Sequence, residues 1–173
     1  MSPTLRKFAT DPNTFVGNDF FDCLQACTHL TSLTSQRSSS YAIPPLDDSP
    51  ANMSDNLLSR LMSPNEEGEY LCPLLDTLEC CEPPDFADKA LYEFISRKQS
   101  GSIPGISKLE RVNNYFNRVA TVPRTEELET FIKQGLSFEV TYTAPPLPRN
   151  QFSALDGLPY SLGSSSFYIK LQK

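Results

Sequence analysis

Proline is the feature that most limits what this chain can fold into. The sequence holds 15 prolines against 7 glycines in 173 residues. Each proline fixes a backbone angle and removes a hydrogen-bond donor, so it interrupts helices and central strands. We therefore expect short elements joined by irregular connections. Hydrophobic residues make up 39% of the chain, which is enough for a core, but we do not expect the whole length to contribute to it.

The charge of the chain excludes several classes of partner. Its formal net charge is -6, and its basic residues occur singly or in pairs, as at Arg97 and Lys98. Binding to a nucleic-acid backbone or an anionic membrane surface requires clustered Lys and Arg. We therefore expect no nucleic-acid partner. We also find no apolar run of the roughly 20 residues that a membrane span needs.

The start of the chain and its cysteines indicate the cellular compartment in which we expect the protein. We recognise no secretory signal in the first residues, and the five cysteines are an odd number. These features favour reduced thiols over a disulfide framework. We expect a cytoplasmic or nuclear protein, or a component of a virion if the chain is viral.

The first half of the sequence predicts only short elements. Apolar residues at helical spacing predict one helix over residues 19–30, and shorter ones over 56–62 and 71–78. The Ser-, Pro- and Asp-rich residues 32–55 cannot bury enough apolar surface to offset the entropy of ordering. We assign residues 1–84 to an N-terminal arm that is extended and partly disordered.

The second half has stronger signals. Apolar stripes and capping residues predict helices over 85–100, 107–119 and 125–134. Alternation predicts strands over 136–143 and 167–171. We therefore expect residues 85–173 to form a small α+β domain, with three short helices followed by a two- or three-stranded antiparallel sheet. Its expected core residues are Phe94, Phe116, Phe131, Phe138, Val140, Phe167 and Ile169.

No catalytic arrangement is evident. His29 is the single histidine, so any Ser-His or Cys-His pair would have to use it, and it lies on the polar side of its expected helix. Phosphate-binding glycine loops and a nucleophile elbow are absent. The paired carboxylates fall in loops or in a helix first turn, where solvent or the helix dipole explains them. We predict that the protein is not an enzyme and carries no cofactor.

A zinc site is the sharper alternative. A tetrahedral zinc needs four nitrogen or sulfur ligands, but the spacing here lacks the usual C-x2-C pairs. Buried cysteines also behave as small hydrophobic residues. We favour the interpretation without a metal. The candidate ligands are Cys23, Cys27, His29, Cys72, Cys80 and Cys81.

Two segments are candidates for binding another protein. Leu57, Leu58, Leu61 and Met62 give the helix at 56–62 an apolar side that suits a partner's groove or the chain's own domain. We leave these two alternatives open. Pro145, Pro146, Leu147 and Pro148 resemble the proline core bound by some WW domains, although a rigid connection is the simpler interpretation.

Three serines match short phosphorylation patterns. Ser49 and Ser63 precede prolines, and Ser100 follows a basic pair. Together these features predict a non-catalytic protein-interaction, regulatory or adaptor protein that acts through a docked N-terminal segment. The alternative is a structural subunit of a large assembly, such as a viral particle or matrix. In both cases the partners are other proteins or further copies of the chain.

Overall fold

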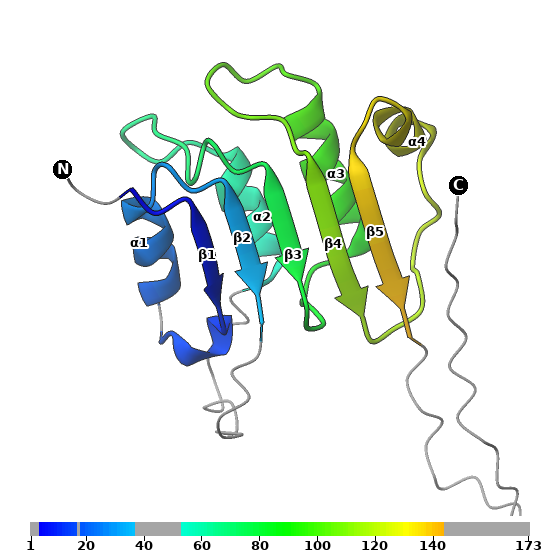
Figure 1. The fold of residues 1–173 in the computed structure, drawn as a ribbon, viewed down its shortest axis with the longest axis horizontal. Coiled ribbons are helices and arrows are strands. Elements are labelled where there is room, and N and C mark those ends of the chain that lie inside the picture. Colours follow the sequence, from blue (N-terminus) through cyan, green and yellow to red (C-terminus); the bar gives the residue numbers. More distant parts are fainter. Residues whose placement is uncertain (1–3, 17, 37–52, 144–173) are drawn as a thin grey trace, which may run out of the picture.

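A single parallel sheet organises the fold (Figure 1). The structure is a computed structural model that describes residues 4–16, 18–36 and 53–143. Within these residues the sheet has five strands, all parallel, which pair in the order of the sequence. The strands are β1 (Lys7–Thr10), β2 (Ser32–Ser35), β3 (Thr77–Cys80), β4 (Arg111–Phe116) and β5 (Ser137–Tyr142).

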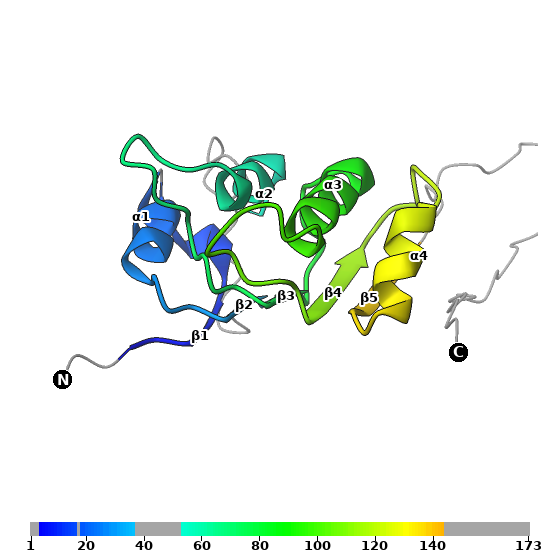
Figure 2. The ribbon, with the colours of Figure 1, turned by 90° about the horizontal axis from the view of Figure 1, so that it is seen from above.

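In the described residues, one α-helix lies in each connection between consecutive strands. A parallel neighbour requires the chain to cross back over the sheet, and a helix usually makes that return. Viewed from above, α1, α2 and α3 lie on the same side of the sheet, and α4 lies at the end of the sheet beside β5 (Figure 2). The helices are α1 (Asp19–Ala26), α2 (Asp55–Met62), α3 (Asp88–Gln99) and α4 (Glu126–Lys133), and a short 3-10 turn, η1 (Pro12–Thr14), precedes α1.

The core lies between the sheet and the helices. Leu33, Leu78 and Val112 are register partners on β2, β3 and β4, and each is at most 1% exposed. The helices meet this row with apolar residues such as Leu24 of α1 and Leu91 of α3, both fully buried. The buried side chains form one continuous cluster that spans residues 20 to 136.

The expected fold class is wrong. The protein has an α/β fold with an all-parallel sheet, in place of an α+β fold with a small antiparallel sheet. The first half of the chain contributes β1, β2 and β3 to the sheet, so the expectation of an extended, partly disordered N-terminal arm is not supported, although residues 37–52 of its Ser-, Pro- and Asp-rich part lie outside the described residues. Strands from both sides of the expected boundary at residue 84 belong to one sheet.

Two expected helices contain strands. Residues 111–116 form β4, although Leu109, Val112 and Phe116 are also spaced as a helix would need. The alternation of β4 is hidden because Asn114, which faces the core at 1% exposure, is polar. Residues 77–80 form β3, and Cys72 before it has a positive φ of 46°, which breaks any helix there.

The other helices and one strand are confirmed. The expected helices at 19–30, 56–62, 85–100 and 125–134 correspond to α1 to α4, although α1 ends at Ala26 and α3 begins at Asp88. Thr125 caps α4, because its Oγ1 accepts a hydrogen bond from the Leu128 amide at 3.2 Å. The strand expected at 136–143 is β5.

The expected core residues divide into three groups. Phe94 and Phe116 are buried, whereas Phe131, Phe138 and Val140 are half-buried and pack against the core. Phe167 and Ile169, with the strand expected at 167–171, lie outside the described residues. The longest of the four helices has only 12 residues, so no helix in the described part of the chain is suited to cross a membrane.

Candidate functional site

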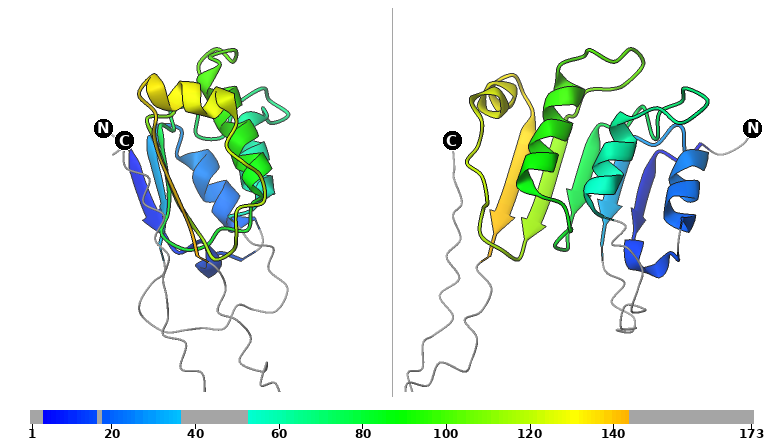
Figure 3. Two further views of the ribbon diagram at one scale, coloured as in Figure 1. Left: turned by 90° about the vertical axis from the view of Figure 1, so that its right-hand side faces the viewer. Right: turned by 180° about the vertical axis from the view of Figure 1, so that it is seen from behind.

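The face of the sheet opposite the helices carries no covering element among the described residues (Figure 3). Parallel sheets in globular proteins usually have helices on both faces. We call this surface the bare face. Its side chains form rows of register partners that run across the five strands. The first row consists of Lys7, Ser32, Thr77, Arg111 and Ser137, and the second consists of Ala9, Thr34, Glu79, Asn113 and Glu139. On β4 and β5 the face continues with Tyr115 and Thr141.

The bare face is polar and balanced in charge. Two cations, Lys7 and Arg111, accompany two carboxylates, Glu79 and Glu139. Arg111 Nη1 lies 3.6 Å from Glu79 Oε1, and the Arg111 side chain is still 60% exposed. Thr34 donates a long hydrogen bond of 3.5 Å to the other oxygen of Glu79. This surface lacks the concentrated positive charge that a polyanion would need.

An open hollow follows the amino ends of the five strands on this face. The first-row side chains line it together with Asp76, Glu110 and Gly135. Thr77 Oγ1 donates to Asp76 Oδ1 at 2.8 Å, so part of the acidic rim is already hydrogen-bonded. Within the described ranges, no group of three or more His, Cys, Asp and Glu side chains is arranged to hold a metal ion. The hollow therefore offers polar contacts without an evident reactive centre.

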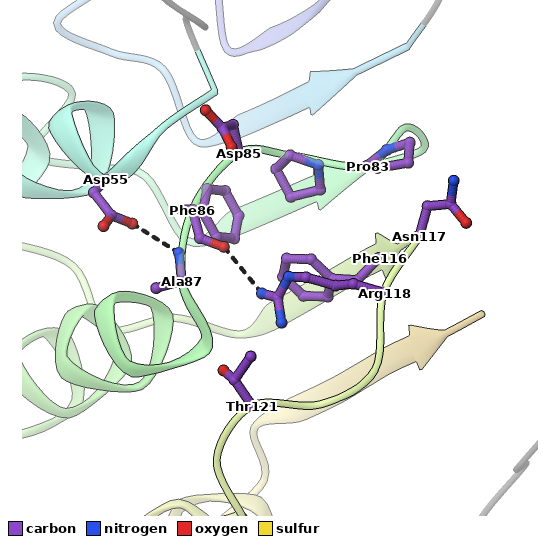
Figure 4. A pocket seen from close by; sticks show the side chains of 10 residues that line it. Asp55, Pro83, Asp85, Phe86, Ala87, Phe116, Asn117, Arg118 and Thr121 are labelled. Atoms are coloured by element: carbon purple, nitrogen blue, oxygen red, sulfur yellow. Dashed lines mark hydrogen bonds between the residues drawn. The ribbon is translucent and has the colours of Figure 1, made fainter. Parts of the chain in front are cut away.

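A second pocket lies at the carboxyl ends of β3 and β4, beside the start of α3 (Figure 4). This is the edge at which open α/β sheets usually bind ligands. Asp55 accepts a hydrogen bond from the Ala87 amide at 2.8 Å, which fixes the chain entering α3. Arg118, on the loop after β4, enters the pocket above Phe116, with its guanidinium carbon 4.2 Å from the ring centre.

The charge of Arg118 is already neutralised. Its Nη2 and Nη1 lie 2.7 and 3.0 Å from the two carboxylate oxygens of Asp88, and Nη2 also donates to the Phe86 carbonyl at 3.1 Å. Asp88 is fully buried and also accepts hydrogen bonds from the Thr121 amide and hydroxyl and from Tyr142. With its nearest counter-charge already paired, this pocket is better explained as a structural junction than as a ligand site.

The pKa values agree with a structural junction. Burial alone would raise the pKa of Asp88, but hydrogen bonds from Arg118, Thr121 and Tyr142 outweigh it and hold that pKa well below its usual range. Burial also raises the pKa of Tyr142, and its neighbours Tyr92 and Asp88 add to the effect. Asp88 is therefore a permanent carboxylate near neutral pH and is unsuited to act as a general acid.

Two thiols with raised pKa values and one buried lysine are poorly suited to act as nucleophiles. Burial raises the pKa of Cys72 to about 12, and burial together with Cys23 raises the pKa of Cys27. Thiols with raised pKa values hold little of the reactive thiolate at neutral pH. Burial lowers the pKa of Lys98 to about 8, but this side chain is 2% exposed and donates to the Leu75 carbonyl.

The residues predicted for partner binding are placed differently from one another. The four apolar residues of α2 are at most 5% exposed and pack in the chain's own core, namely Leu57, Leu58, Leu61 and Met62. Ser63 and Ser100 are exposed, whereas Ser49 and the segment Pro145 to Pro148 lie outside the described residues. His29 is exposed near the end of α1.

Sequence reasoning missed the bare face. The signal that marks it is the polar set of residues at alternate positions in β1 to β5. That signal becomes visible only after residues 32–35, 77–80 and 111–116 are assigned to strands.

Comparisons of the chain with protein families, with curated proteins and with solved structures find no match.

Proposed function

We propose that this chain is a non-catalytic protein-binding module that recognises another protein through the bare face. The observation that carries the proposal is the arrangement of the fold, in which α1, α2 and α3 cover one face of a parallel sheet and no described element covers the other. A parallel sheet with an open face is uncommon, and a partner that covers this face would account for it.

The construction of the sheet suits a binding surface. Its inward residues are fixed in a continuous core, so the outward residues of the same strands are held in defined positions. Side chains on a sheet point directly outward from their strands, and stacked repeats of strands and helices commonly use such surfaces for binding. A partner would therefore meet a preordered surface, which lowers the entropic cost of association.

The residue types on the bare face favour a protein as the partner. The face carries no excess charge, and it combines Arg111 and Tyr115, which belong to types enriched in protein interfaces, with Thr and Asn side chains that make adaptable hydrogen bonds. It lacks an apolar surface that would enter a lipid bilayer. We accordingly place the interaction on the sheet, because the apolar residues of α2 are used in the core.

The test compares two double variants with matched chemistry. Asn113→Arg with Glu139→Arg places two cations on neighbouring strands of the bare face, where both side chains are exposed. Asn56→Arg with Glu93→Arg makes the same two changes on exposed positions of α2 and α3, on the helix side. The partner is first identified by crosslinking and mass spectrometry in the native source, and its affinity for each purified variant is then measured.

We expect the face variant to lose at least about tenfold in affinity, because two uncompensated charges disrupt a polar interface. The helix-side variant should bind as the wild type does, and both should keep the wild-type melting temperature. Equal binding by the two variants would overturn the proposal. Self-association of the wild type in sedimentation, abolished by the face variant alone, would favour a structural subunit over an adaptor.

A further inference from the structure

Among the described residues, no strand pairs with the outer edge of β5. The Ser137 amide donates to Glu110 O at 2.9 Å, and the Thr143 amide donates to Phe116 O at 2.8 Å. Because parallel strands use alternate residues for each neighbour, the amides at 137, 139, 141 and 143 point toward β4. Phe138, Val140 and Tyr142 therefore direct their N–H and C=O groups toward the opposite edge, where the described residues provide no strand.

The same edge is also where the apolar core is least covered. Phe138 and Val140 continue inward rows whose members on β4, Val112 and Asn114, are buried, yet both are only half-buried. Phe131 and Ile132 of α4 are half-buried as well. When the molecule is viewed onto this edge, α4 lies across one end and the connection leading to it runs on the helix side (Figure 3, left). β5 thus resembles a terminal repeat without its cap.

We propose that residues 167–171 of the same chain dock on this edge as a sixth parallel strand. This segment alternates Phe167, Ile169 and Leu171 with Tyr168 and Lys170. Three apolar residues on one side match the three inward residues of β5. Lys170 then brings a positive charge to the side of the sheet that carries Glu139.

The length of chain after β5 permits this arrangement. A parallel return must cover the length of a six-residue strand, which is about 20 Å. Residues 117–136 make such a return between β4 and β5 and contain α4. Residues 144–166 separate β5 from the docking segment in the sequence, so this connection is longer than one that the fold already uses. The chain can therefore reach its own edge without help from a second copy.

The docked strand requires specific backbone bonds. In a parallel pair, the residues of the new strand that bond to β5 are those whose side chains point outward, namely Tyr168 and Lys170. Their partners are the N–H and C=O groups of Phe138, Val140 and Tyr142. The proposal is independent of the binding role of the bare face, since it concerns the edge of the sheet.

Amide hydrogen exchange in the full chain, followed residue by residue by NMR, tests the proposal. In the wild type we expect slow exchange at Phe138, Val140 and Tyr142. Ile169→Asp replaces an inward apolar side chain by a charge and should speed exchange of these three amides at least about tenfold. The amides of Glu139 and Thr141, which bond to β4, should stay protected and report that the sheet is intact. Gln172→Asp, which adds the same charge at an outward position just after the docking segment, should leave the edge amides protected.

Two results would overturn the proposal. One is fast exchange at the three edge amides in the wild type, or exchange rates that Ile169→Asp does not change. The other is edge protection that increases with protein concentration, because this would assign the edge to a second copy of the chain.

Discussion

Asp88 connects three parts of the fold at a single buried carboxylate. It lies in the first turn of α3 and holds Arg118 and Thr121 of the loop after β4, as well as Tyr142 at the end of β5. A buried charge is tolerated only when its hydrogen bonds are satisfied, and here both carboxylate oxygens have several donors. The loop that carries Arg118 is therefore fixed by one side chain of a neighbouring helix.

The first stability prediction concerns this carboxylate. Asp88→Asn removes the charge opposite Arg118 and should lower the free energy of unfolding by about 3 kcal/mol at pH 7, measured by urea denaturation. Glu93→Gln on the exposed side of the same helix breaks only a surface ion pair with Lys89. This variant should change the free energy of unfolding by less than about 0.5 kcal/mol. Equal effects of the two variants would contradict the role of Asp88.

The pH dependence follows from the lowered pKa of Asp88. A carboxyl whose pKa is lower in the folded state stabilises the fold above its unfolded value of about 3.9 and loses that contribution as the pH falls through its folded value. The difference in unfolding free energy between the wild type and Asp88→Asn should therefore be full at pH 6 and shrink progressively below about pH 4. A difference that stays constant to pH 2 would be inconsistent with this linkage.

At the scale of elements, a double substitution in α2 tests whether this helix is an integral part of the core. Leu58 and Leu61 are each 2% exposed and pack in the core. Leu58→Asp with Leu61→Asp places two unpaired charges there, and each costs several kcal/mol against a total stability of about 5–15 kcal/mol. We expect the double variant to lose its cooperative unfolding transition in circular dichroism.

The control for this prediction lies on the same helix. Asn56→Asp with Ser59→Asp adds the same charges at exposed positions and should leave the fold intact. A folded Leu58→Asp, Leu61→Asp variant would show that α2 is not an integral part of the core.

The helices could be predicted from the sequence, but most of the strands could not. Thr125 and the apolar stripe after it are local signals, and α4 forms where they indicate. β2 and β3 have only four residues each, too few for a reliable alternation. Ser35 and Asn114 face the core although they are polar, and neither side-chain polar atom of Asn114 has a hydrogen-bond partner among the described residues. Because the bare face depends on strand register, it could not be found without the strands.

At the scale of the whole molecule, the sheet joins the two halves of the chain. β3 pairs with β4 across the expected domain boundary, and the core includes residues from both sides. We expect a single cooperative unfolding transition, in which NMR signals of Leu33 in β2 and Val112 in β4 disappear at the same urea concentration. If the NMR signal of Leu33 disappeared at a lower urea concentration than that of Val112, residues 1–84 would form a separate unit.

The order of the strands has a consequence for synthesis on the ribosome. Each described strand after β1 pairs with the strand that precedes it in the sequence, and none is inserted between two earlier ones. A newly emerged strand therefore finds its neighbour already made, and the nascent sheet can extend in one direction as translation proceeds. Until the next strand arrives, the most recently added one is always the exposed edge.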